Sequence, residues 1–134
     1  MADAIRGRGA VLDTSVALAM FLPDEKEGGI AKTILRGKTY FIVPELINYE
    51  FRNSLWVAVA RRRRIKFNQA QDILARFEKL PLIYKDVKLD KAFDLSCENG
   101  VAFYDAVFLW LAIKEKAELL TLDVKLKEIY AKCQ

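Results

Sequence analysis

Four acidic residues stand beside short apolar runs that are spread along this chain. Asp13 and Asp123 each come directly after an apolar run that favours a buried strand. Asp105 stands in the first turn of an apolar helix that precedes the second of these runs, and Glu50 lies on a long amphipathic segment. Carboxylates that converge can hold a divalent cation and support hydrolysis of a phosphate ester. The sequence therefore raises the question of whether the fold brings these four acids together.

The absence of histidine narrows the chemistry that this chain can do. None of its 134 residues is a histidine, which removes the commonest general base, the serine and cysteine nucleophiles that depend on it, and histidine-ligated zinc. The two cysteines, Cys97 and Cys133, do not have the spacing of a metal site. Hydrolysis would have to come from carboxylates, hydroxyls, lysines or a metal held by oxygen.

Short apolar strands alternate with helices along the sequence, which is typical of a parallel sheet covered on both faces. We expect strands at residues 10–12, 39–43, 82–84 and 118–122, and helices at 16–22, 24–36, 44–64, 68–80, 88–98, 104–116 and 124–131. Right-handed crossovers place the carboxyl ends of all such strands at one edge, where ligands bind. Asp13 and Asp123 follow strands directly, and a glutamate side chain at position 50 could reach the same edge.

Each acid also has a structural interpretation. Asp13 and Asp123 stand where helix N-caps stand, Asp105 suits the dipole of its helix, and Glu50 could be solvated. Glu50 is the least cap-like, because apolar residues surround it and a buried carboxylate needs a partner. Four converging carboxylates would raise one another's pKa values, and a divalent ion would offset that cost. All-oxygen ligation favours Mg²⁺ or Mn²⁺.

Size and composition predict one compact cytoplasmic domain spanning residues 1–134. The chain is 53% hydrophobic, which is enough to build a core. Two cysteines are too few for a disulfide framework, so a reducing compartment fits best. The longest apolar run, residues 106–113, is far shorter than the roughly 18 to 20 residues that span a bilayer. We therefore expect no contact with a membrane.

A run of four arginines, Arg61, Arg62, Arg63 and Arg64, closes the long helix expected at residues 44–64. Guanidinium groups make bidentate contacts with phosphates, so the run is a candidate RNA-binding segment. The net charge of +4 permits a polyanionic partner. Positive residues at a helix C-terminus also oppose the helix dipole and usually face water. Both interpretations stay open.

Four segments of the chain resemble the PIN-domain family, and especially its VapC toxin branch. They are Val11-Leu12-Asp13-Thr14-Ser15, Pro44-Glu45-Leu46 leading to Glu50 and Asn53, Phe103-Tyr104-Asp105-Ala106, and Leu120-Thr121-Leu122-Asp123. They occur in the order of the family and cover nearly the whole chain. One Asp-Thr-Ser is common, but four ordered segments make a specific signal.

This resemblance implies a three-layer α/β/α domain with a central parallel sheet of four to five strands. It also implies an endoribonuclease dependent on Mg²⁺ or Mn²⁺, the toxin of a type II toxin–antitoxin system, restrained by a cognate VapB-type antitoxin and leaving a 5′-phosphate and a 3′-hydroxyl. The family's acidic positions fall on Asp13, Glu50, Asp105 and Asp123, with Ser15, Asn53 and Thr121 as supporting polar residues. Glu45 is a weaker candidate, because it precedes the usual glutamate. Such domains commonly end in a short edge strand, whereas this sequence stops at Gln134, so the fifth strand is expected to be absent or very short.

Bulky apolar residues on two segments could serve the core or a partner. They are Phe21, Leu22, Leu46, Tyr49, Trp56 and Val57. Burial is the favoured interpretation, while an antitoxin helix or a second copy in a homodimer is the alternative. The segment from Phe103 to Trp110 is likewise better interpreted as a buried helix than as a platform for base stacking.

A different class of function stays possible on the sequence alone. The acids could be helix caps, and the chain could be a non-catalytic module that binds RNA or a protein partner. Two other α/β phosphoryl enzymes fit poorly. Receiver domains need an acidic pair before the phosphoacceptor, and haloacid-dehalogenase-like sites need Asp-x-Asp, whereas this chain has Asp13-Thr14-Ser15.

Overall fold

A four-stranded parallel sheet forms the centre of the computed structural model, which describes residues 9–134. Its strands are β1 (Gly9–Leu12), β2 (Tyr40–Val43), β3 (Leu82–Tyr84) and β4 (Glu118–Leu120), in the order β3-β2-β1-β4. Each neighbouring pair is parallel, and in the register Val11 of β1 lies between Ile42 of β2 and Leu119 of β4. The central strand β1 is therefore surrounded by β-branched and aliphatic residues, as a doubly covered sheet requires.

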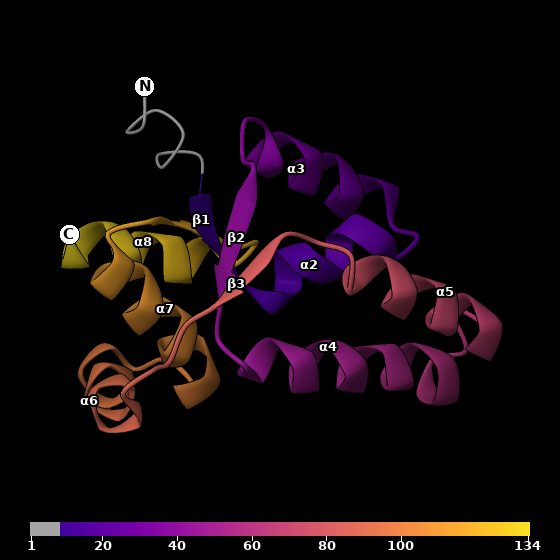
Figure 1. The fold of residues 1–134 in the computed structure, drawn as a ribbon. Coiled ribbons are helices and arrows are strands. Elements are labelled where there is room, and N and C mark those ends of the chain that lie inside the picture. Colours follow the sequence, from indigo (N-terminus) through magenta and orange to yellow (C-terminus); the bar gives the residue numbers. More distant parts are fainter. Residues whose placement is uncertain (1–8) are drawn as a thin grey trace.

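Helices cover both faces of this sheet (Figure 1). On one side lie α6, α7 and α8, and on the other lie α2, α3, α4 and α5. Their bounds are α2 (Thr14–Phe21), α3 (Glu25–Leu35), α4 (Leu46–Trp56), α5 (Phe67–Phe77), α6 (Leu89–Asn99), α7 (Phe103–Glu115) and α8 (Val124–Cys133). The three-layer α/β/α architecture expected from the sequence is confirmed.

The core explains why α7 is apolar on nearly every side. This helix packs on both β1 and β4 and also contacts α6 and α8, so residues Ala106 to Leu109 are all buried. The expectation of a buried helix is borne out there, although Tyr104 in the first turn is exposed. Gly100 ends α6 in the left-handed conformation with φ 63°, which a residue without Cβ adopts at low cost.

The long helix expected from residues 44 to 64 is shorter and ends differently. After α4 the chain continues as a π-helical turn, η1 (Val57–Arg61). The amide of Arg62 donates to the carbonyl of Val57 at 2.9 Å, which is five residues back instead of four. The widened turn replaces the last α-helical turns, so the arginine run does not continue the α4 surface.

The carboxyl-terminal part of the sheet is also shorter than expected. Strand β4 ends at Leu120, because the Thr121 hydroxyl accepts a hydrogen bond from the Asp123 amide at 3.1 Å and turns the chain into α8. Among residues 9–134 the sheet contains four strands, and α8 occupies the end of the chain. None of the helices in this range combines the length and the apolar character that crossing a membrane needs.

Five of the six apolar residues considered for the core divide into two groups, and the sixth, Val57, is half-buried. Phe21, Leu22 and Leu46 pack against the core. Tyr49 and Trp56, however, are 70% and 53% exposed on α4. The interpretation of these two as core residues is wrong, because they lie on the side of α4 that faces away from the sheet and from α2.

Candidate active site

Asp13 stands where β1 ends and α2 begins, and it is only 6% exposed. Its Oδ1 accepts hydrogen bonds from the Ser15 hydroxyl at 2.6 Å and from the Val16 amide at 3.2 Å. Burial raises the pKa of the Asp13 carboxyl above its ordinary 3.8, against hydrogen bonds from Ser15, Thr121 and Val16 that lower it. Asp13 is thus a helix cap, as one interpretation held, but a cap placed in the interior at the carboxyl edge of the sheet.

Glu50 reaches this edge from α4. Its Oε1 accepts a hydrogen bond from the hydroxyl of Thr14 at 2.7 Å, across 36 residues of sequence. Burial raises the pKa of the Glu50 carboxyl; the Thr14 hydrogen bond opposes that rise, and the charges of Asp105 and Asp13 add to it. The solvated alternative for Glu50 is therefore wrong, since the carboxyl is half-buried and held by the residue next to Asp13.

Asp105 and Asp123 complete the edge from the other side of the sheet. Asp105 is half-buried in the first turn of α7, where burial and the charge of Asp123 raise its pKa. Asp123 is exposed and caps α8, its Oδ1 accepting from the Leu126 amide at 3.1 Å. The Asp105 carboxyl comes from α7, and the Asp123 carboxyl comes from the turn between β4 and α8.

These four residues form one electrostatic group, here called the acid group (Asp13, Glu50, Asp105 and Asp123). Asp105 interacts with each of the other three, because its charge raises the pKa of Asp13 and Glu50 and its own pKa responds to Asp123. In the described part of the chain, no lysine or arginine is among the causes of these shifts. The acids thus share one edge and repel one another.

The side chains of the acid group do not form a closed ligand cage. Across residues 9–134, no set of three or more Asp, Glu, Cys or His side chains is arranged so that it could hold an ion. Asp13 and Asp123 are turned toward the amides that they cap. A set of four metal ligands therefore stays a prediction.

Hydroxyl groups connect the acid-bearing segments to one another. Ser15 donates to Asp13 and accepts from the Leu122 amide at 3.1 Å, so it links the start of α2 to the end of β4. Thr121 is fully buried and shapes the turn before Asp123. Thr14, which the resemblance did not single out as a supporting residue, binds Glu50. Its position next to Asp13 is the only sequence signal that could have suggested this role.

The other two sequence candidates lie outside this arrangement. Asn53 is exposed on α4, and no hydrogen bond of the described residues joins its side chain to the acid group. Glu45 is exposed as well, and its Oε1 accepts from Asn48 at 3.1 Å in a separate network.

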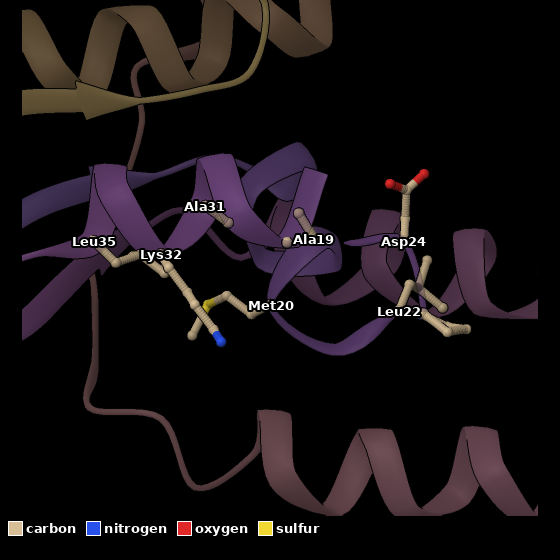
Figure 2. A pocket seen from close by; sticks show the side chains of 9 residues that line it. Ala19, Met20, Leu22, Asp24, Ala31, Lys32 and Leu35 are labelled. Atoms are coloured by element: carbon tan, nitrogen blue, oxygen red, sulfur yellow. The ribbon is translucent and has the colours of Figure 1, made fainter. Parts of the chain in front are cut away.

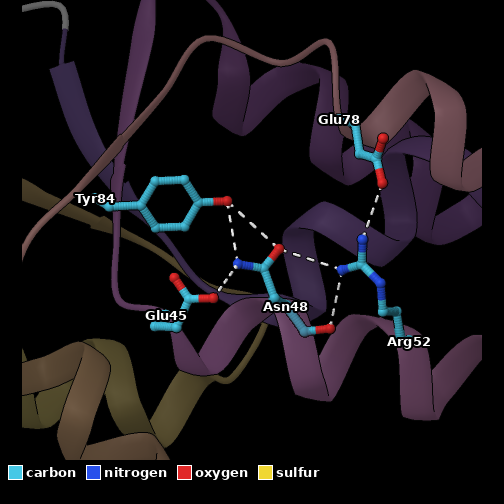
Figure 3. A network of polar contacts seen from close by, with 5 residues as sticks. All are labelled: Glu45, Asn48, Arg52, Glu78 and Tyr84. Carbon is cyan, nitrogen blue, oxygen red and sulfur yellow. Dashed lines mark hydrogen bonds and ion pairs between the residues drawn. The ribbon is translucent and has the colours of Figure 1, made fainter.

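That separate network surrounds the exposed side of α4 (Figure 3). We call it the Arg52 network; its members are Glu45, Asn48, Arg52, Glu78 and Tyr84. Arg52 forms an ion pair with Glu78 at 3.0 Å and a hydrogen bond to Asn48 at 3.2 Å. The Tyr84 hydroxyl lies 3.1 Å from the Asn48 amide nitrogen. The Arg52 network therefore contains one positive charge, on Arg52, and two acidic side chains, Glu45 and Glu78.

A groove lies directly beside the acid group. Its volume is about 540 Å³, and Ser15 and Asp123 line one part of it. Arg62 and Arg64 line it too, together with Ser54 of α4, which sequence reasoning missed. The four arginines are all exposed, but Arg61 and Arg63 are not among the residues that line this groove.

A second cavity is unrelated to the acids. It has a volume of about 510 Å³ and lies between α2 and α3, with Ala19, Met20 and Leu35 on its walls (Figure 2). Among the described residues, the only carboxylate on it is Asp24, whose Oδ1 caps α3 by accepting from the Glu27 amide at 3.0 Å. None of the residues singled out from the sequence for catalysis lines this cavity.

With this geometry in place, comparison with known proteins decides the family. The model of the PIN domain matches residues 10–132. The chain belongs to the PIN-domain family. The matched range includes all four members of the acid group, and the expectation drawn from the four ordered sequence segments is confirmed.

Two proteins from Pyrobaculum aerophilum resemble this PIN domain. It is 32% identical to "Ribonuclease VapC3" over 125 residues, which cover 88% of this chain and 92% of that protein. The crystal structure of PAE2754 matches with a TM-score of 0.67 and 23% identity, covering 93% of this chain and 94% of that one. The likeness to PAE2754 concerns the fold alone, because most side chains differ between the two proteins.

Proposed function

We propose that this PIN domain is a divalent-metal-dependent endoribonuclease, the VapC-type toxin of a type II toxin–antitoxin pair. The observation that carries the proposal is the acid group itself, in which carboxylates from separate segments interact at one sheet edge. Among the residues that the structure describes, no lysine or arginine contributes to the raised pKa values of Asp13, Glu50 and Asp105. The relative named as a VapC ribonuclease, matched over nearly its full length, supports RNA as the substrate. The alternative of a non-catalytic module does not explain why carboxylates that repel one another lie close together in the acid group.

The donor set of the site fits a hard cation. All candidate ligands are oxygens, from the carboxylates of Asp13, Glu50, Asp105 and Asp123, and the chain has no histidine. Such donors suit Mg²⁺ or Mn²⁺ and not zinc. PIN-domain ribonucleases are in general metal-dependent, and the choice between the two ions is part of this proposal. When bound, the ion would lower the pKa of a water molecule and neutralise charge on the phosphate.

The residues of the chain would orient the reaction. Ser15 and the Val16 amide hold the Asp13 carboxylate in place, and Thr14 holds that of Glu50. A water oxygen attacks phosphorus in line, one carboxylate accepts the water proton, and the bond from phosphorus to the 3′ oxygen breaks. The leaving oxygen takes up a proton, which gives a 5′-phosphate and a 3′-hydroxyl. Thr121 and Ser15 would act by holding the β4–α8 turn, and so Asp123, against α2.

A cleavage assay tests this function. Labelled RNA is incubated with Mn²⁺ and with wild type, Asp13→Asn or Glu78→Gln. We expect Asp13→Asn to cut at least ~10²-fold more slowly, in the range of a lost catalytic acid or base. Glu78→Gln, which removes an exposed carboxylate of the Arg52 network, should cut like wild type. Equal cleavage by wild type and Asp13→Asn, insensitive to EDTA, would rule out the proposed site.

The partners belong to the same proposal. A VapB-type antitoxin would restrain the toxin, and a second copy would form a homodimer. The exposed rings of Tyr49 and Trp56, seven residues apart on α4, are apolar surface suited to a protein partner. Sedimentation that detects only a monomer at high protein concentration would remove the homodimer from the proposal.

A further inference from the structure

The groove beside the acid group follows helix α2 away from the sheet edge. Ser15, Leu18 and Leu22 line it along one face of this helix, since residues three and four apart share a face. The eight residues from Ser15 to Leu22 span roughly 10 Å at the α-helical rise. The groove is therefore long enough to continue past the phosphate that reacts at the acids. Its opposite wall comes from the end of α4 and from η1.

The irregular backbone after α4 brings two arginines into this groove. In an α-helix, residues two apart point in nearly opposite directions, yet Arg62 and Arg64 both line the same groove. The Arg62 amide bonds to Val57 and the Arg64 amide to Ala58, which is six residues back, at 2.8 Å. Between them Arg63 has a φ of 52°, an unfavourable conformation for a residue with a side chain. Such π turns and strained residues are frequent at functional sites.

The four-arginine run is thus divided into two pairs. Arg62 and Arg64 face the groove, and in the region that the structure describes neither guanidinium takes part in an ion pair or a side-chain hydrogen bond. Arg61 instead lies over the ring of Trp56, with its Cζ 6.0 Å from the ring centroid. Because a continuous helix would distribute all four around its surface, this division follows from the π turn.

We infer that Arg62 and Arg64 hold the phosphate of a nucleotide adjacent to the one that is cut, and so position single-stranded RNA along α2. This rests on the proposed function, since it gives the substrate groove of that same site. Asp123 and Glu27 also line the groove and would repel an RNA backbone, so the two guanidiniums offset that repulsion at the place where it occurs. The Ser54 hydroxyl on the same wall is a further donor for a phosphate oxygen. Arg62 and Arg64 are positioning residues in this account.

The test compares two double variants with the same reduction in charge. Arg62→Gln with Arg64→Gln changes the groove pair, and Arg61→Gln with Arg63→Gln changes the other pair. Binding of a fluorescent single-stranded RNA is measured in EDTA, where the metal-dependent cleavage cannot occur, over a range of salt concentrations. We expect the groove pair to weaken binding about 10-fold or more, because charged hydrogen bonds to the RNA are removed. Its salt slope should fall by about 0.7, since one phosphate of the single strand is no longer neutralised.

The control variant shows whether RNA binding depends on the two arginines in the groove or only on the total positive charge of the arginine run. Arg61→Gln with Arg63→Gln should bind RNA nearly as wild type does. Equal weakening by both pairs, or no weakening by the groove pair, overturns the inference, and circular dichroism checks that each variant is folded. Arg62→Lys with Arg64→Lys should recover the salt slope but only part of the affinity, because lysine cannot bind a phosphate in the bidentate manner.

Cleavage with Mn²⁺ in parallel separates this inference from the proposed function. If wild type binds RNA through Arg62 and Arg64 but does not cut it, the proposed nuclease function is wrong and the inferred role of the groove is supported. If wild type cuts RNA, and the variant Arg62→Gln with Arg64→Gln binds and cuts it as well as wild type does, the inference about the groove is wrong and the proposed function stands.

Discussion

Helix α4 carries two polar clusters of opposite character on its two sides. On one side Glu50 belongs to the acid group, which is half-buried to buried apart from Asp123 and contains no cation. On the other side Asn48 and Arg52 belong to the Arg52 network, in which Arg52 lies between Glu78 and the Asn48 carbonyl groups (Figure 3). Residues 48 and 52 are one turn apart, whereas residue 50 points away from both.

The difference between the clusters indicates what each is for. Exposed ion pairs are screened and contribute little, and the Arg52 network is satisfied as it stands. Three members of the acid group, Asp13, Glu50 and Asp105, cost stability, because burial and neighbouring acidic charges disfavour their charged forms. Buried carboxylates whose pKa values are raised, with no lysine or arginine of residues 9–134 among the causes of the shifts, are typical of a site whose charge is neutralised by a ligand.

The largest effect on stability should come from neutralising a member of the acid group. In EDTA at neutral pH, Asp13→Asn should raise the melting temperature by about 2 °C or more. Asparagine still caps a helix, but it removes a buried charge whose pKa burial raises.

The pH dependence of this effect follows from the direction of the shift. Stability from a group with a raised pKa is fully present below its unfolded pKa, here 3.8, and is lost as the pH rises through the folded pKa. The advantage of Asp13→Asn over wild type should therefore vanish toward pH 4 and grow toward neutral pH, as followed by thermal melts in EDTA. If Asp13→Asn is less stable than wild type at neutral pH, the charged carboxylate of Asp13 does not destabilise the fold and the prediction is wrong.

A smaller effect is expected from the Arg52 network. Arg52→Ala should lower the free energy of unfolding by about 0.2 to 1 kcal/mol, the usual range for an exposed ion pair. The decrease should shrink in high salt, as urea denaturation can measure. A decrease of several kcal/mol, or slower RNA cleavage, would make this network more than a surface contact and break the comparison.

The sequence predicts the sheet well because its strands are buried on both faces. Residues 10–12 and 82–84 fall within β1 and β3 as observed, since continuous apolar runs leave few other structures. Helix starts at Asp13, Asp24 and Asp123 follow from capping residues that are visible in the sequence. The end of α4 could not be predicted in this way, because no proline or glycine marks the change from α to π geometry at Val57.

The site could be predicted as a set of residues but not as an arrangement. Glu50 stands out in the sequence as a carboxylate among apolar neighbours, and it does lie against Thr14. That Thr14 and not Asn53 is its partner depends on how α4 crosses α2, which no local pattern encodes. The division of the arginine run depends likewise on the backbone of η1 and Arg63.

Titration of Mn²⁺ by calorimetry tests the central claim most directly, because it asks whether the acid group is a metal site without requiring a substrate. Wild type should bind Mn²⁺, Asp13→Asn and Glu50→Gln should each bind it about 10- to 100-fold more weakly or worse, and Glu78→Gln should bind like wild type. Failure of wild type to bind Mn²⁺, or an affinity that Asp13→Asn and Glu50→Gln leave unchanged, would contradict the account.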